Sequence, residues 1–172
     1  MDIEGIVEDL RITILPRRGQ LHKLALGYAP RDPHYIVIAE AYASYPPQYR
    51  VIASEELAHI ILEYEIWDSA TLPEGFAGHE LSAAQVESIE GNADYLCGAL
   101  LCPKDDFTAQ FLSQQARIVA VGGPKDRAIK AIVEAVAKEF QITVWRAARH
   151  AAHLNLLAWA DHDRIYVRNI AM

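Results

Sequence analysis

The chain has 172 residues, of which 52% are apolar and 23% are charged, and 16 Lys and Arg against 23 Asp and Glu give it a formal charge of −7. This length and apolar fraction suit one folded domain with a substantial core and exclude wholesale disorder. An acidic chain argues against broad, sequence-independent binding of nucleic acids, which needs a basic face. No segment approaches the roughly 20 uninterrupted apolar residues of a membrane span, and the acidic N-terminal segment lacks the basic flank of a signal peptide. Together with a cysteine count of two, which suits no disulfide framework, these features predict a cytoplasmic protein.

The first part of the chain predicts a short helix and a small sheet. Apolar residues recur at helical spacing over residues 2–10. Three segments rich in Ile, Leu, Val or Tyr then follow between turn residues, and they predict a small antiparallel sheet. These segments are 11–15, 23–28 and 35–39. We expect Pro46 and Pro47 to close a Tyr-rich loop that follows the sheet.

The rest of the chain predicts mostly helices. A helical pattern covers residues 49–65, a loop with prolines and glycines covers 68–79, and Ser82 is a plausible N-cap for a helix that stops at Pro103. Two further helices are predicted over 126–139 and 143–159, and a short strand-like tail over 164–167. The order of elements predicts an α+β fold. We divide it into a core (1–112), a linker (113–125) and C-terminal helices with a tail that complete the same domain (126–172).

The helix over 51–64 carries a group of side chains that suits metal chemistry. Glu55, Glu56 and His59 fall within about a 100° sector of this helix, opposite its apolar face. Glu55 and His59 are four residues apart, so their side chains lie one above the other and could grip one ion. The same pattern also suits an ordinary solvated face, because Glu63 lies in the same sector.

Glu90 stands inside the apolar stripe of the next helix, near Ala93 and Cys97. A carboxylate is rarely buried without a partner, since the loss of hydration costs several kcal/mol. We therefore expect Glu90 to be buried against a metal ion, a cluster of N–H donors or an arginine; the candidate arginines are Arg50, Arg117 and Arg146.

Several segments of the chain resemble the ImmA/IrrE family of metallopeptidases. Residues 54–59 (SEELAH) are similar to the AHExxH helix of zinc metallopeptidases. Residues 90–103 (EGNADYLCGALLCP) resemble the family's E..AN.FA..LLMP segment, and residues 137–157 are similar to its LA..F.VS...V..RL..LGL ending. Residues 35–39 match the strand before the motif helix. The resemblance covers most of residues 1–158.

The resemblance implies a zincin-like domain with a gluzincin-type site that holds zinc. Carried over residue by residue, His59 matches the second histidine ligand, Glu90 the third ligand and Glu56 the catalytic base. Glu55 stands where the family has its first histidine. Members of the family commonly cleave a helix-turn-helix repressor, which is the partner that the resemblance implies.

The glutamate at the first ligand position leaves three outcomes open. Glu55 could itself ligate the metal, and the harder Glu/His/Glu site would then shift from zinc toward manganese or iron. Another histidine could take its place, with His22 and His79 as distant candidates. In the third outcome the site is empty and the domain is an inactive pseudopeptidase that binds a protein. We predict a metal-dependent peptidase in which Glu55, His59 and Glu90 hold the metal, with the pseudopeptidase as the alternative.

Three other features are interpreted as structural. The helix over 143–159 carries Arg146, Arg149, His150 and His153 on one stripe. We predict that His150 and His153 are solvated rather than a metal pair, and that the helix closes the domain, as the resemblance implies, rather than reading DNA. Tyr42, Tyr45 and Tyr49 pack the loop before the motif helix instead of lining a peptide groove. We expect Cys97 and Cys102 to behave as small buried hydrophobes.

Overall fold

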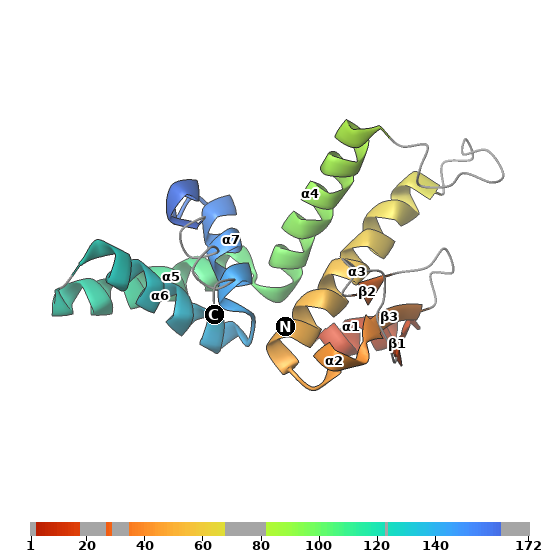
Figure 1. The fold of residues 1–172 in the computed structure, drawn as a ribbon, viewed down its shortest axis with the longest axis horizontal. Coiled ribbons are helices and arrows are strands. Elements are labelled where there is room, and N and C mark those ends of the chain that lie inside the picture. The colour runs from red at the N-terminus through yellow and green to blue at the C-terminus, as the bar shows by residue number, and fades with distance from the viewer. Residues whose placement is uncertain (1–2, 18–26, 29–34, 68–81, 123, 163–172) are drawn as a thin grey trace.

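The computed structural model of the protein describes residues 3–17, 27–28, 35–67, 82–122 and 124–162. In chain order its elements are α1 (Ile3–Asp9), β1 (Thr13–Arg17), β2 (Gly27–Tyr28), β3 (Tyr35–Ala39), α2 (Glu40–Ala43), α3 (Pro46–Trp67), α4 (Ala83–Leu101), α5 (Lys104–Val121), α6 (Lys125–Phe140) and α7 (Val144–His153). Figure 1 shows the sheet, α1 and the long pair α3 and α4 on one side, and the hairpin of α5 and α6 reaching away on the other. The structure is mostly helical with one small sheet, as the predicted α+β class requires.

The sheet is mixed, so the predicted antiparallel arrangement is wrong for one of its two pairs. Its strand order is β1-β3-β2, with β1 parallel to β3 and β2 antiparallel to β3. The third predicted strand, 35–39, is confirmed, and it is the central strand. A central strand with neighbours on both edges reads as a continuous apolar run, and Ile36, Val37 and Ile38 are all buried.

Helix α3 begins earlier than predicted, at Pro46. A proline at the start of a helix is tolerated because the first N–H groups have no partner inside the helix. The two prolines therefore open the helix instead of closing a loop. Helix α4 begins as predicted: the Ser82 hydroxyl accepts from the Gln85 backbone N–H, and the Gln85 side chain accepts from the Ser82 backbone N–H.

The break between the last helices is narrower than the predicted linker over 113–125. Helix α5 continues to Val121, and Pro124 is already the N-cap of α6. Gly122 ends α5 with a φ of 75°, a conformation that glycine adopts without steric cost. Helix α7 ends at His153, earlier than the predicted 159, and the predicted tail over 164–167 lies outside the described residues, as does the predicted loop over 68–79.

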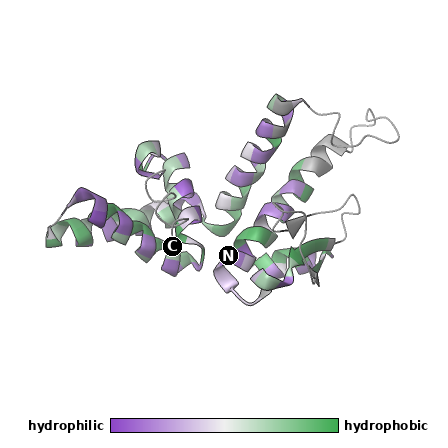
Figure 2. Ribbon diagram, viewed as in Figure 1, coloured by the Kyte–Doolittle hydropathy of each residue, from purple (hydrophilic) through white to green (hydrophobic). Residues whose placement is uncertain are grey.

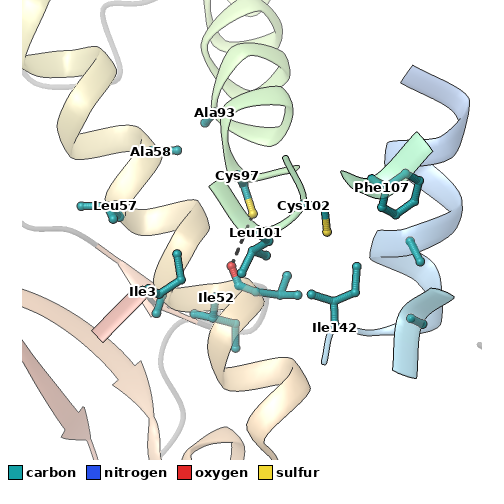
Figure 3. Close-up of a cluster of buried hydrophobic side chains, with 14 of the residues drawn as sticks. Ile3, Ile52, Leu57, Ala58, Ala93, Cys97, Leu101, Cys102, Phe107 and Ile142 are labelled. Carbon is teal, nitrogen blue, oxygen red and sulfur yellow. Dashed lines mark hydrogen bonds between the residues drawn. The ribbon is translucent and has the colours of Figure 1, made fainter. Parts of the chain in front are cut away.

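One apolar core runs through the junction of α3, α4 and α7. Figure 3 shows Cys97 pointing from α4 toward α3, where its thiol lies 3.6 Å from the Val51 carbonyl oxygen. On the other side, Phe107 packs edge-on against the His150 ring of α7 at 4.8 Å between centroids. Both cysteines are free and buried, as predicted. The described helices include none that is long and apolar enough to span a membrane.

Candidate functional site

The candidate residues lie on three helices that meet at one end of the core. Helix α3 carries Glu55, Glu56 and His59, and α4 lies alongside it with Glu90. Helix α7 packs against α4 and brings in Arg146, which sequence reasoning had named among the arginine partners of a buried carboxylate. The junction therefore combines residues from positions far apart in the chain.

His59 and Glu90 come together as the sequence predicts. The His59 Nε2 atom lies 3.6 Å from the Glu90 Oε2 atom, across the gap between α3 and α4. The His59 side chain is 15% exposed and that of Glu90 is 60% exposed. An imidazole beside a carboxylate at this distance forms an ion pair when the histidine is protonated, and the same two groups are common metal ligands.

The expectation that Glu90 is buried is wrong. Every described α4 side chain before Ala93 is exposed or only partly covered, and the buried side of the helix begins at Ala93. In the part of the chain that the structure describes, α7 joins α3 against the second half of α4, through contacts at Asp94, Tyr95 and Gly98. The buried carboxylate of this helix is instead Asp94, one turn further along the same stripe.

Glu55, at the first ligand position of the family pattern, faces an arginine. Its Oε2 atom lies 3.8 Å from the Arg146 Nη2 atom. Burial raises the pKa of the Glu55 carboxyl above its ordinary range, and the Arg146 guanidinium works in the opposite direction by favouring the charged form. A guanidinium is protonated at all physiological pH values, so the neighbour of Glu55 on this side is a permanent cation.

Arg146 is held in the core by Asp94. It is 1% exposed, and its Nη1 atom donates to the Asp94 Oδ1 atom at 2.6 Å and to the Asp94 carbonyl oxygen at 3.1 Å. The second carboxylate oxygen of Asp94 accepts from the Arg149 Nε atom at 2.7 Å. The Trp145 ring lies beneath both guanidinium groups, at 5.0 and 5.3 Å from its centroid. Two carboxylates and two arginines thus balance one another's charge, with Asp94 and Arg146 buried and Glu55 and Arg149 about one-third exposed.

The prediction that His150 lies on a solvated stripe of α7 is wrong, whereas His153 and Arg149 on the same stripe are 20% and 33% exposed. Arg146 and His150 are both almost fully inaccessible. The His150 Nε2–H donates to the Cys102 carbonyl oxygen at 2.9 Å, and burial lowers the pKa of His150 to about 4. Helix α4 makes room for this ring with Gly98, where a Cβ atom would clash with the His150 imidazole. A helix that turns these side chains inward cannot offer them to DNA.

Glu56, the candidate general base, is partly buried on α3 and lies near the buried thiol of Cys97. The negative charges of Glu55 and Glu56 add to burial, the larger cause, in raising the pKa of Cys97 to about 12. This thiol is therefore protonated at neutral pH, and it packs as a small apolar group. The two histidines considered as substitute ligands, His22 and His79, lie outside the described residues.

Asp94 and Arg149 are the members of the site that sequence reasoning missed. The signal for Asp94 was present, since it is four residues after Glu90 and directly follows Ala93 on the predicted apolar stripe. Within the part of the chain that the structure describes, His, Cys, Asp and Glu side chains form no group of three that could hold a metal ion.

The sequence matches no protein-family model and no curated protein at a significant level. The resemblance to the ImmA/IrrE family therefore stays a prediction.

Proposed function

We propose that this chain is an ImmA/IrrE-like domain that is catalytically silent and acts by binding a protein partner. The observation that carries the proposal is the contact between Glu55 and the buried guanidinium of Arg146. At the position where the resemblance implies a metal-ligating histidine, this chain has a carboxylate that faces an internal cation. An ion pair inside the protein thus takes the place of the first metal–ligand contact.

The charges near Glu55 favour this arrangement over a divalent ion. Asp94 and Glu55 are balanced by Arg146 and Arg149. A metal bound by Glu55 would lie close to the buried guanidinium of Arg146, and two positive centres at such a distance repel each other. If Glu55 turned away toward a metal, it would also leave Arg146 with less compensation in the core.

A metal-dependent peptidase is the second candidate, and the contact between His59 and Glu90 favours it. In this alternative Glu55, His59 and Glu90 hold zinc, manganese or iron, and Glu56 activates the water that attacks a peptide bond. His59 and Glu90 fit such an ion as a pair of ligands, since they already lie 3.6 Å apart. Glu55 fits less well because it lies against Arg146.

The resemblance to the ImmA/IrrE family also supports a proposal about the partner that the domain binds. We propose a helix-turn-helix repressor, which this domain would hold without cutting, in the cytoplasm. A candidate repressor encoded beside the gene should co-elute with the protein and remain at full length. Appearance of repressor fragments that depend on Glu56, and disappear in Glu56→Gln, would favour the peptidase.

Metal titration tests the proposal directly. We expect the purified wild-type protein to bind zinc or manganese weakly and well below one equivalent in isothermal titration. Glu55→His restores the family motif and should create metal affinity, since three ligands then surround one position. Glu55→Gln is the matched control: it removes the same charge but adds no imidazole, so it should not gain affinity.

One result would overturn the proposal. If the wild-type protein binds one equivalent of metal tightly, and His59→Ala and Glu90→Ala each abolish this binding, then the site is a working metal centre. A thermal midpoint that falls on addition of a chelator would support the same conclusion.

A further inference from the structure

The outer half of the hairpin of α5 and α6 has no buried residue among those that the structure describes. We define the distal arm as residues 112–131. None of its described residues is buried, whereas Phe107 and Phe111 before it and Ile132 and Val133 after it are packed into the core. Figure 1 shows the arm projecting away from the other helices.

The distal arm exposes apolar side chains as well as polar ones. Leu112, Val119 and Val121 are 50%, 60% and 85% exposed. Leu112 and Val119 are seven residues apart and so lie on the same face of α5, with Ala116 between them. Figure 2 shows hydrophobic positions reaching the outer end of the hairpin. Apolar side chains grouped on a projecting element are typical of a protein–protein contact.

The charge of the distal arm is opposite to that of the rest of the chain. It contains four basic residues and one acidic residue, Asp126, and is therefore net +3 within a chain of −7. Two of the four, Lys125 and Lys130, form ion pairs with Asp161 at 3.5 Å and Glu134 at 3.6 Å, so the charge that the arm offers a partner comes from its two arginines. Arg117 and Arg127 are both exposed. The remainder of the molecule consequently carries −10, so any copy of this chain offers the arm a surface of complementary charge.

The surface that matches the distal arm is the outer face of α1. This helix buries Ile3 and Val7 against the body and leaves Glu4, Glu8 and Asp9 exposed. Leu10, which directly follows the helix, is 49% exposed. The α1 face thus offers three exposed carboxylates and an exposed leucine, with the exposed Arg11 beside it, against an arm that offers Arg117 and Arg127 with an exposed leucine and valines. Helix α1 packs on α3, far from the arm in Figure 1, so one copy cannot bring its own two surfaces together without unfolding.

We propose that the distal arm docks on the α1 face of a second copy of this chain. If the two copies are related by a two-fold axis, each arm meets the partner's α1 face and the assembly closes as a dimer with two equivalent contacts. The apolar side chains supply the contact area, and the opposite charges set its orientation. This assembly is independent of whether the domain binds metal or cleaves peptides.

Sedimentation velocity on the full chain tests the dimer through a charge exchange. The wild type should dimerise as its concentration rises and dissociate as salt is added. Arg117→Glu with Arg127→Glu should weaken dimerisation about tenfold or more, and so should Glu8→Lys with Asp9→Lys. An equimolar mixture of the two variants should regain the dimer, since the reversed arm of one then meets the reversed α1 face of the other.

The controls separate this contact from general charge effects. Lys104→Glu with Lys138→Glu reverses two exposed charges outside the distal arm and should leave dimerisation unchanged. A wild type that stays monomeric at all concentrations overturns the proposal. So does a dimer that the charge reversals do not weaken, or a mixture that fails to regain it. A monomer that binds vesicles containing phosphatidylserine through Arg117 and Arg127 would assign the arm to a membrane surface instead.

Discussion

The inner and outer sides of the junction between α3 and α4 carry the same kinds of side chain in different environments. On the inner side, Asp94 holds a guanidinium that is 1% exposed, and Glu55 faces the same group. On the outer side, Glu90 is 60% exposed and lies 3.6 Å from His59. The inner charges are compensated within the protein, while in the outer pair Glu90 is exposed to solvent and His59 is largely covered. The difference indicates that structural stability depends on the inner side and that a ligand would meet the outer one.

The largest effect should follow removal of the buried guanidinium. Arg146→Met keeps much of the side-chain volume but leaves Asp94 buried beside Glu55 without its main cation. Breaking a buried pair in this way costs about 3–5 kcal/mol of the free energy of unfolding. Urea denaturation followed by circular dichroism measures this loss. Arg149→Met is the matched control: its partly exposed side chain contacts the same carboxylate, and we expect it to cost about 1 kcal/mol. If the two variants lose the same free energy of unfolding, then the burial of Arg146 does not make it more important for stability than Arg149.

Acid should lower the free energy of unfolding through His150, which is buried on α7 one turn after Arg146. Burial lowers the pKa of His150 to about 4 from its ordinary 6.5, so below about pH 6.5 the unfolded chain binds a proton that the folded chain does not. Stability from this group is complete above pH 6.5 and is lost as the pH falls toward 4, by about 2–3 kcal/mol in total. The raised pKa of Glu55 acts in the opposite direction, because protonation of that carboxyl favours the folded state. We compare the loss of unfolding free energy between pH 7 and pH 4.5 in the wild type and in His150→Gln. Both proteins contain Glu55, so the difference between the two losses is the contribution of His150. If the two proteins lose the same stability on acidification, His150 is not the buried base.

The close approach of α4 and α7 provides a third test. A methyl group at Gly98 would clash with the His150 ring, which is fixed by its hydrogen bond to the Cys102 carbonyl oxygen. Gly98→Ala should therefore cost about 1–3 kcal/mol, although alanine is the better helix former. Gly91→Ala is the control: no atom lies within 4 Å of its added methyl group, so it should stabilise α4 slightly. Thermal unfolding that responds alike to both substitutions would contradict the packing of the two helices.

Local signals in the sequence predicted the elements better than the tertiary contacts. The Ser82 cap, the central strand over 35–39 and the meeting of His59 with Glu90 all follow from residue types at short spacing or from the family pattern. The periodicity of α4 placed a carboxylate on its packed side, but it could not say where along the helix the packing begins. That boundary depends on α7, which lies more than 40 residues further along the chain. On α7, His150 was predicted as solvated for the same reason, because a histidine is buried only when a distant partner such as the Cys102 carbonyl oxygen compensates it.

The smallest effect should come from the outer pair. Glu90→Gln removes the charge of an exposed side chain, and exposed ion pairs contribute about 0–1 kcal/mol, so the free energy of unfolding should change by less than about 0.5 kcal/mol. The substitution tests the comparison between the two sides, because a metal-bound Glu90 would behave differently. In that case stability would depend on the concentration of free metal, since binding to the folded state alone stabilises it by mass action. Urea denaturation with and without a chelator measures both the effect of Glu90→Gln on the free energy of unfolding and its dependence on metal. A small loss that the chelator does not alter is the expected outcome. The outer side would be a metal centre if Glu90→Gln lowered the free energy of unfolding by several kcal/mol. In that case a chelator should lower the stability of the wild type by the same amount and should not change that of the variant.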